Sequence, residues 1–546
     1  MLFIKTLYTL IVFLSAFFIL AFAPQGFPDE GKLEESIGHL GSSSRQEIIA
    51  AVEALRQLGD HRALPALEAL LDRRLRVTKV GRILIKVKNG HGMMDAVTGV
   101  ALAQQLDGLD TPVINNQVRI VLSQTIAILK LVSPEAEMRL AAAEELLQHP
   151  QEEATSALRT AIDREKNTRV RRALALALAL TEVAGSNKER RIAALNIIGQ
   201  SDNPNFIVNL KPLLARQASG EFQEPDEQVR QAARSALSAI ERHMVVVGVM
   251  QNLFYGLSLG SVLLLVALGL AITFGLMEVI NMAHGEMLML GAYSTYVIQG
   301  IFKAHCPDQI AWYLVASIPT AFIVAGVVGM ILERSIIRYL YGRPLETLLA
   351  TWGISLLLIQ TVRLIFGAQN VEVSNPPWLS GGWELMPGLM LTYNRIAIIC
   401  FGLGVVLLVW LFLNRSPLGL QVRAVTQNRA MAAALGIYTS RVDTWTFGLG
   451  SGIAGLAGVA LSQIGNVGPE LGQSYIVDSF MVVVLGGVGK LAGTIWGATG
   501  LGVINKFLEP FTGAVLGKIM VLVFIILFIQ KRPQGIFALK GRMAEG

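Results

Sequence analysis

The chain has 546 residues, of which 53% are hydrophobic and only 16% charged, which is too apolar for an ordinary soluble protein. Residues 28–243 hold 28 basic and 28 acidic residues, whereas residues 244–546 hold 17 basic and 12 acidic ones, with the basic residues gathered in short loops. The formal net charge of +6 therefore indicates orientation in a membrane, and no aromatic and basic stripe suggests a nucleic-acid groove.

Residues 1–27 have the pattern of a signal peptide or an N-terminal anchor. Lys5 precedes an apolar run, Leu7 to Leu20, and the small-residue sequence Ala21-Phe22-Ala23 follows. Pro24 is a poor context for cleavage, so cleavage and retention both stay open. In either case we expect the next domain to leave the cytoplasm.

Residues 28–243 are predicted to form a periplasmic helical-repeat domain. Short amphipathic segments with Ala and Leu at helical spacing recur at 48–58, 63–71, 139–147, 191–198 and 229–237. Such helices stack into α-solenoids, and the pattern resembles HEAT-type repeats of irregular period. Val77–Val87 interrupts the series with β-branched residues and predicts a hairpin or an insertion. The domain is either a scaffold without chemistry or a docking surface for a periplasmic partner.

Residues 244–546 contain a series of hydrophobic segments, most of them near the ~20 residues needed to cross a membrane. They are 253–275, 279–301, 312–332, 347–366, 396–413, 445–464, 476–488, 491–507 and 516–529. The two segments around Lys490 are short and rich in glycine, so they are candidates for partial re-entry. The predicted fold class is all-α: a polytopic membrane helical bundle of 8–9 segments, preceded by the soluble HEAT-like domain.

Loop charge predicts the orientation of the bundle. Basic residues concentrate in 333–344, 414–444 and the tail. The alternate loops, 302–311, 367–395 and 465–475, contain only two basic residues, Lys303 and Arg395. By the positive-inside rule the basic loops are cytoplasmic. The amino-terminal domain is then periplasmic and the carboxyl terminus cytoplasmic, which requires an odd number of crossings, such as nine.

The stretch 275–293, GLMEVINMAHGEMLMLGAY, places polar residues in an apolar setting: Glu278, Asn281, His284 and Glu286. Ionisable groups at such positions usually face a protein interior or a water-filled path. If one helix begins near Glu278, Asn281 and His284 share a face, while Glu286 points away from both and lies roughly 12 Å deep. Either the helix breaks near Gly285, or these residues serve different contacts.

Residues 422–435 are rich in alanine and predict one short basic amphipathic helix that ends at Gly436. From composition alone, docking of a cytoplasmic partner and a place on the membrane surface are equally supported. Glycines crowd the spans at 448–458 and 486–497, and we expect most of them to permit close helix packing.

The sequence contains no complete motif for nucleotide binding, metal binding or catalysis. Gly486–Lys490 resembles a phosphate loop, but Val484 replaces its first glycine and Leu491 its Ser or Thr. Cys306 and Cys400 imply neither a disulfide framework nor a metal site. We therefore expect no catalytic residue, no metal and no cofactor of the chain's own, and a function other than enzyme catalysis.

Four stretches, in family order, resemble the LivH-type permeases: 281–293, 351–358, 419–437 and 482–498. These are membrane subunits of ABC importers for branched-chain amino acids, urea and short amides. A signal and a helical extension ahead of the family core resemble the urea-permease (UrtB) branch.

The resemblance implies a passive pathway in the inner membrane. A periplasmic binding protein would deliver substrate, a LivM-like second permease would pair with this chain, and two cytoplasmic ATPases would bind ATP. It places Asn281, His284, Gly285 and Glu286 on or near the pathway, and the ATPase-coupling segment at Arg423, Ala424, Asn428, Ala432 and Gly436. The alternatives are a branched-chain amino acid or amide permease, a self-contained channel or secondary transporter with a sensing domain, and a scaffold without transport.

Overall fold

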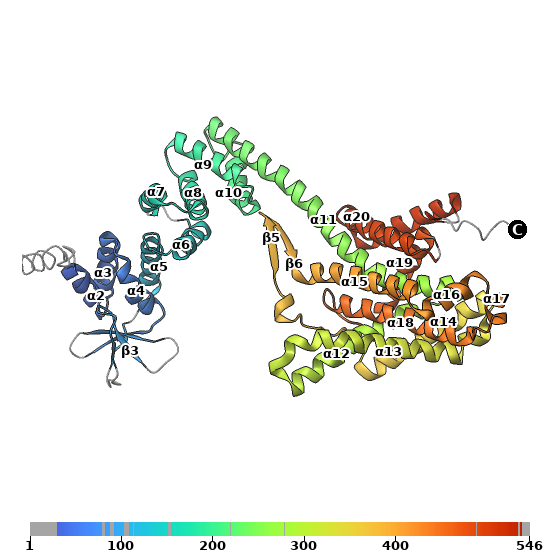
Figure 1. Cartoon of the computed structure of the whole chain (residues 1–546). Helices are drawn as coiled ribbons and strands as arrows, with labels where there is room; N and C mark the ends of the chain where they lie inside the picture. Colours follow the sequence, from blue (N-terminus) through green and yellow to red (C-terminus); the bar gives the residue numbers. More distant parts are fainter. Residues whose placement is uncertain are drawn as a thin grey trace, which may run out of the picture. The chain divides into compact units, whose positions relative to one another are not determined.

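The computed structural model describes residues 30–78, 82–87, 92–102, 109–112, 114–150, 154–218, 220–277, 279–487, 489–532 and 535–537. The chain divides into two compact units, Met1–Arg242 and His243–Gly546 (Figure 1). The predicted signal or anchor at residues 1–27 lies outside the described residues.

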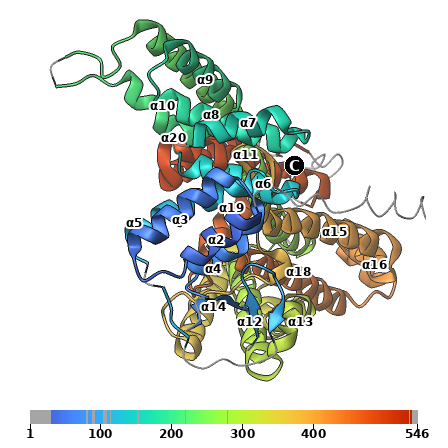
Figure 2. The same cartoon turned by 90° about the vertical axis from the view of Figure 1, so that its left-hand side faces the viewer.

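The first unit consists mainly of short helices that pack against their neighbours in the chain (Figure 1 and Figure 2). They are α2 (Glu30–His39), α3 (Arg45–Leu58), η1 (His61–Ala63), α4 (Leu64–Leu71), α5 (Asn116–Lys130), α6 (Ala136–Gln148), α7 (Thr155–Arg164), α8 (Thr168–Val183), α9 (Lys188–Gln200), η3 (Pro204–Phe206) and α10 (Ile207–Leu214), followed by the start of α11 (Glu227–Met277). Asparagines cap several of them: Asn115, Asn167 and Asn187 accept hydrogen bonds from the first-turn backbone N–H groups of α5, α8 and α9.

The apolar cores of this unit follow one another along the chain. Leu55 and Leu122 belong to the first core, Leu174 to the second, and Leu195 to the third. Each core joins helices that are close in sequence, as expected where a single helix pair cannot bury its own apolar face. The assignment to HEAT-type repeats stays a prediction.

The hairpin predicted at Val77–Val87 is confirmed. β1 (Leu75–Val77) pairs antiparallel with β2 (Ile83–Lys86), with Arg76 opposite Leu84. β3 (Met93–Asp95) and β4 (Ala101–Leu102) extend it to a four-stranded antiparallel sheet in sequence order. Because Leu75, Ile83 and Ile85 belong to the first helical core, the sheet is a packed part of the unit. The all-α class therefore holds for most of the chain, but it missed this sheet.

The second unit is a helical bundle with one small hairpin. Its elements after α11 are α12 (His284–His305), η4 (Pro307–Trp312), α13 (Tyr313–Ser335), η5 (Ile337–Leu340), α14 (Pro344–Phe366), η6 (Pro377–Leu379), β5 (Gly382–Met386), β6 (Leu389–Thr392), α15 (Tyr393–Arg415), α16 (Pro417–Gln427), α17 (Arg429–Ala434), α18 (Thr439–Ser462), α19 (Leu471–Gly486) and α20 (Leu491–Lys531).

Among the described residues, six stretches are long and apolar enough to cross a membrane: 227–275, 307–335, 344–366, 393–415, 439–462 and 491–531. The chain is thus a multi-pass membrane protein, while the count of eight or nine segments stays a prediction. α19 is a shorter apolar helix. Gly513, at φ 78°, interrupts α20 between the two segments that the sequence separates there.

Glycines allow the central helices of this unit to touch at the backbone. A Cβ at Gly291 of α12 would overlap the carbonyl oxygen of Gly455 in α18, and one at Gly458 would overlap that of Leu288. α11 meets α18 in the same way at Gly269 and Gly450. The close packing predicted for the glycines of 448–458 is confirmed, and it holds α12 and α18 in one register.

This packing predicts that Gly291→Ala destabilises the bundle, because the added methyl must displace backbone. We expect a loss of roughly 1–3 kcal/mol, seen as less folded chain in membranes and a lower melting temperature in detergent. Gly300→Ala is the matched control, since a Cβ there, in the same helix, meets no atom within 4 Å. Equal yields and melting temperatures for the two variants would contradict the prediction.

Candidate functional site: a buried polar break between membrane helices

The polar motif lies where two membrane-unit helices are interrupted. α11 ends at Met277 and α12 begins at His284, so the predicted helix starting near Glu278 is wrong. Asn281 precedes α12 instead of sharing a helix face with His284. Its Oδ1 accepts a hydrogen bond from the backbone N–H of Ala283 at 3.0 Å, a local bond with which asparagine competes against helix formation.

Of the four polar residues of the motif, Glu278 lies outside the described residues, and the other three are almost fully buried: Asn281 is 2% exposed, His284 0% and Glu286 1%. His284 Nε2 lies 3.1 Å from the carbonyl oxygen of Val266 in α11, and Ser355 in α14 donates to Glu286 Oε1 at 2.9 Å. The motif is therefore tied to two other helices.

Each of these side chains keeps one polar atom without a hydrogen-bond partner among the described residues: Asn281 Nδ2, His284 Nδ1 and Glu286 Oε2. A carbonyl only accepts, so the hydrogen of the neutral His284 ring is on Nε2 and Nδ1 is an acceptor. An unmatched buried polar atom costs about 1–3 kcal/mol. Three within six residues leave a donor and acceptors available to a polar solute.

Gly285 has a packing role rather than a role in breaking the helix. It lies in the first turn of α12, directly after the non-helical residues 279–283, so the alternative of a helix break near Gly285 agrees with the structure. A Cβ here would overlap the carbonyl oxygen of Gly472 in α19, and one at Gly472 would lie 2.8 Å from Glu286 Oε2. The glycines bring α19 against the unmatched carboxylate oxygen.

The predicted single helix at 422–435 is two helices. α16 and α17 are separated by Asn428, which is extended at φ −155° and caps α17 by accepting from the N–H of Met431 at 2.9 Å. Gly436 follows at φ 89°. Ala432 is buried against Val425 in one small core, while Ala424 packs at its edge. The asparagine ends one helix and begins the next because its side chain replaces a backbone acceptor.

The arginines of this segment bond within the chain. Arg423 donates to the carbonyl oxygen of Leu413 at the end of α15. Arg429 forms an ion pair with Asp443 of α18, which is 1% exposed on its side chain, and stacks over the Tyr341 ring at 4.8 Å. These arginines hold α16 and α17 against the bundle, a role that the sequence analysis missed.

Three large apolar residues at the end of the segment are exposed. Met431 is 58% exposed, Leu435 77% and Tyr438 71%. Met431 and Leu435 are four residues apart, a spacing that places them on one helical side and that could have identified them from the sequence. No sequence pattern indicated that Ser355 is the hydrogen-bond partner of Glu286, although the stretch that contains it, 351–358, carries the family resemblance.

Comparisons with known proteins cover the second unit. The family described as branched-chain amino acid transport system / permease component matches residues 252–529. The chain is 30% identical to the permease protein BraD of Pseudomonas aeruginosa and 31% identical to LivH of Salmonella typhimurium, over 53% of this chain and 95% and 94% of theirs. The chain is 25% identical to LivM of Escherichia coli, over 51% of this chain and 68% of that protein.

The relatives BraD and LivH are both described as high-affinity branched-chain amino acid transport system permease proteins. The LivH-type resemblance seen in the sequence is confirmed. A permease subunit is not an enzyme, and the expected non-enzymatic function is confirmed by these relatives. The chain belongs to the family of permease components of branched-chain amino acid transport systems.

Proposed function

We propose that this chain forms part of the translocation pathway of an ABC importer and that its substrate is urea. A LivM-like permease completes the membrane pathway, two ATPases bind ATP on the cytoplasmic side, and a periplasmic binding protein delivers the substrate. The observation that carries the proposal is the buried polar break between α11 and α12 in a unit of the permease family.

Non-helical backbone at membrane depth is tolerated where it is buried in protein or lines a water-filled cavity. Substrate sites of membrane transporters are typically built from such interrupted helices. The break supplies unmatched hydrogen-bonding atoms at Asn281, His284 and Glu286. A solute that passes along it can exchange bonds to water for bonds to these atoms, so the break is a suitable lining for a polar pathway.

Urea is small, neutral and rich in hydrogen-bonding groups. The Asn281 amide can donate to its carbonyl oxygen, and His284 Nδ1 can accept from its amide hydrogens. Architecture also supports urea: the relatives align with about half of this chain, and the helical unit ahead of that half resembles the urea-permease branch.

A branched-chain amino acid is the alternative, and it is favoured by the names of the relatives. The ammonium group of an amino acid would need a negative partner, and Glu286 Oε2 is an unmatched acceptor at the break. An amino acid substrate would therefore need Glu286 as a partner for its ammonium group, whereas urea would not.

We further propose that the first unit is periplasmic and the carboxyl terminus cytoplasmic, in the bacterial inner membrane. The support is the placement of basic residues in loops that alternate with loops holding only two basic residues, Lys303 and Arg395.

In this orientation, α16 and α17 form the ATPase-coupling segment. Arg423, Ala424, Asn428, Ala432 and Gly436 fix its shape, and the exposed Met431, Leu435 and Tyr438 make the contact. Exposed apolar residues gathered at one place are typical of protein interfaces.

The pathway proposal predicts that Asn281→Leu and His284→Leu lower urea uptake per assembled complex by about tenfold or more, since tenfold corresponds to ~1.4 kcal/mol and each removes an unmatched polar atom that can bond urea. Met282→Leu, a neighbouring change without loss of a polar group, should transport like the wild type. The measurement is ATP-dependent uptake of labelled urea and labelled leucine in proteoliposomes of the complete importer. Full urea uptake with leucine at both 281 and 284 would remove the substrate role.

Glu286→Leu separates the two substrates. For urea it should mainly lower the yield of assembled complex, by about 1–3 kcal/mol of stability, because the Ser355 hydroxyl loses its acceptor. Ser355→Ala should then have a similar but smaller effect. If the importer transports leucine but not urea, and Glu286→Leu abolishes leucine transport while Asn281→Leu and His284→Leu do not, the branched-chain amino acid alternative replaces the urea proposal.

The coupling proposal predicts that Met431→Asp with Leu435→Asp leaves the chain in the membrane but weakens ATPase attachment and uptake. A charged pair in an apolar interface must be desolvated without compensation. Gln427→Asp, at an exposed polar position of the same segment, is the control. We would measure copurification of the ATPase subunits together with uptake. Unchanged copurification in the double variant would show that the ATPases dock elsewhere.

A further inference from the structure

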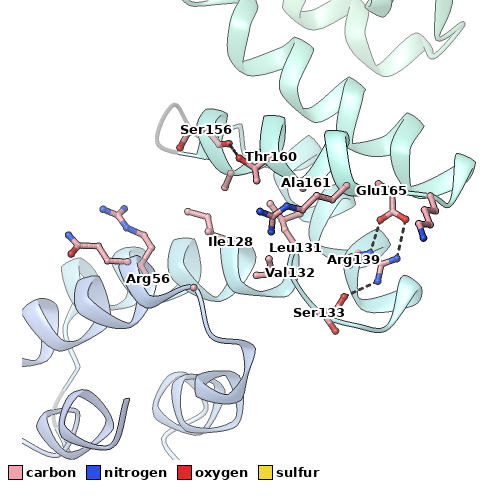
Figure 3. A pocket seen from close by; sticks show the side chains of 15 residues that line it. Arg56, Ile128, Leu131, Val132, Ser133, Arg139, Ser156, Thr160, Ala161 and Glu165 are labelled. Atoms are coloured by element: carbon pink, nitrogen blue, oxygen red, sulfur yellow. Dashed lines mark hydrogen bonds and ion pairs between the residues drawn. The ribbon is translucent and has the colours of Figure 1, made fainter. Parts of the chain in front are cut away.

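The first unit contains a cavity of about 680 Å³ that belongs to no site described so far. It lies between the end of α3, the end of α5 and the helices α6 and α7 (Figure 3). Its floor is apolar, formed by Ile128, Leu131, Val132, Ala157 and Ala161. Val132 is 47% exposed, so the structure leaves this floor open to solvent.

The rim of the cavity is basic. Among the described residues, Arg56 of α3, Arg164 of α7 and Lys166 form no ion pair, and all three line the opening. Glu165 is the acidic residue in the lining, and its charge is already matched by Arg139 (Figure 3), with Nε 2.6 Å from Oε2. The hydrogen bond from Arg139 lowers the pKa of Glu165 to about 2, so it stays ionised. The rim therefore has an excess of three positive charges.

The combination of floor and rim restricts the occupant. A single inorganic anion would leave most of the cavity and its apolar floor uncovered, because 680 Å³ is in the usual range for pockets that bind whole ligands. A purely apolar occupant would leave three cations unmatched. Ser156 and Thr160 add hydroxyl groups to one wall. An acidic segment with apolar side chains matches both features.

We infer that this cavity, the α3–α7 groove, binds an acidic, amphipathic surface segment of the substrate-binding protein. The identity of the partner rests on the proposed function, which places this unit on the side from which substrate arrives. Capture by a unit covalently linked to the permease would raise the local concentration of the binding protein to the order of millimolar. Complementary charge would also speed the encounter.

The first experiment tests the groove with a defined probe. The full chain in lipid nanodiscs is titrated against a fluorescent helical peptide that has glutamates on one face and leucines on the other, followed by anisotropy. We expect Arg56→Glu, Arg164→Glu and Lys166→Glu together to weaken binding by about tenfold or more. Raising NaCl from roughly 50 to roughly 300 mM should weaken wild-type binding as well.

The controls distinguish the groove from general basicity and from misfolding. Arg190→Glu changes an exposed arginine of α9 outside the groove and should bind the peptide normally. Peptides with lysine for glutamate, or with glutamine for leucine, should bind poorly to the wild type. Circular dichroism and thermal melting check that the triple variant is folded. Equal binding of the acidic peptide by the triple variant and by Arg190→Glu overturns the inference.

The second experiment tests the partner. The triple variant is reconstituted in proteoliposomes with the ATPases and the second permease. Its uptake should be slower than that of the wild type at a limiting concentration of binding protein and should match it at a saturating concentration. Peptide binding without this shift overturns the partner assignment. If the wild type transports no urea or leucine, the proposed function fails, while the peptide experiment still decides whether the groove binds an acidic segment.

Discussion

Burial of unmatched polar atoms at the start of α12 is the constraint on which the second unit depends. Asn281, His284 and Glu286 are buried among apolar helices, and each is tied to the protein by one hydrogen bond while another polar atom stays unmatched. At about 1–3 kcal/mol for each such atom, the break costs a sizeable part of the stability of a domain. The rest of the bundle has to hold it in place.

Glycine contacts supply much of that support. α12 meets α18 at Gly291 and Gly455, and meets α19 at Gly285 and Gly472, with backbones too close for any side chain. α18 begins beside the ion pair of Arg429 and Asp443, which joins it to α17. A displacement of α16 and α17, the proposed coupling segment, therefore has a short packed route, through α18, to the helix that begins at the polar break.

Helical periodicity and the length of the hydrophobic segments were sufficient to predict that the chain is mostly helical and crosses the membrane several times. The hydrophobic segments, the close glycine packing and the hairpin after α4 follow from local patterns that tertiary contacts do not overrule. The sequence left open whether the helix breaks near Gly285, because the break depends on a bond between the Asn281 side chain and the following backbone, and the helix-forming residues around it give no sign of this. The partners Ser355 and Asp443 could not be assigned, because the sequence does not state which helices lie side by side.

The central claim, that the polar break lines the pathway, is tested most directly by its accessibility. In a chain with Cys306 and Cys400 replaced by serine, Asn281→Cys would be probed with a membrane-impermeant thiol reagent in the working importer. We expect labelling whose rate changes between the ATP-free and the vanadate-trapped states, while Ala457→Cys, in the core between helices, stays unlabelled. An active importer in which the thiol at 281 is unlabelled from either side of the membrane in both states would contradict the account.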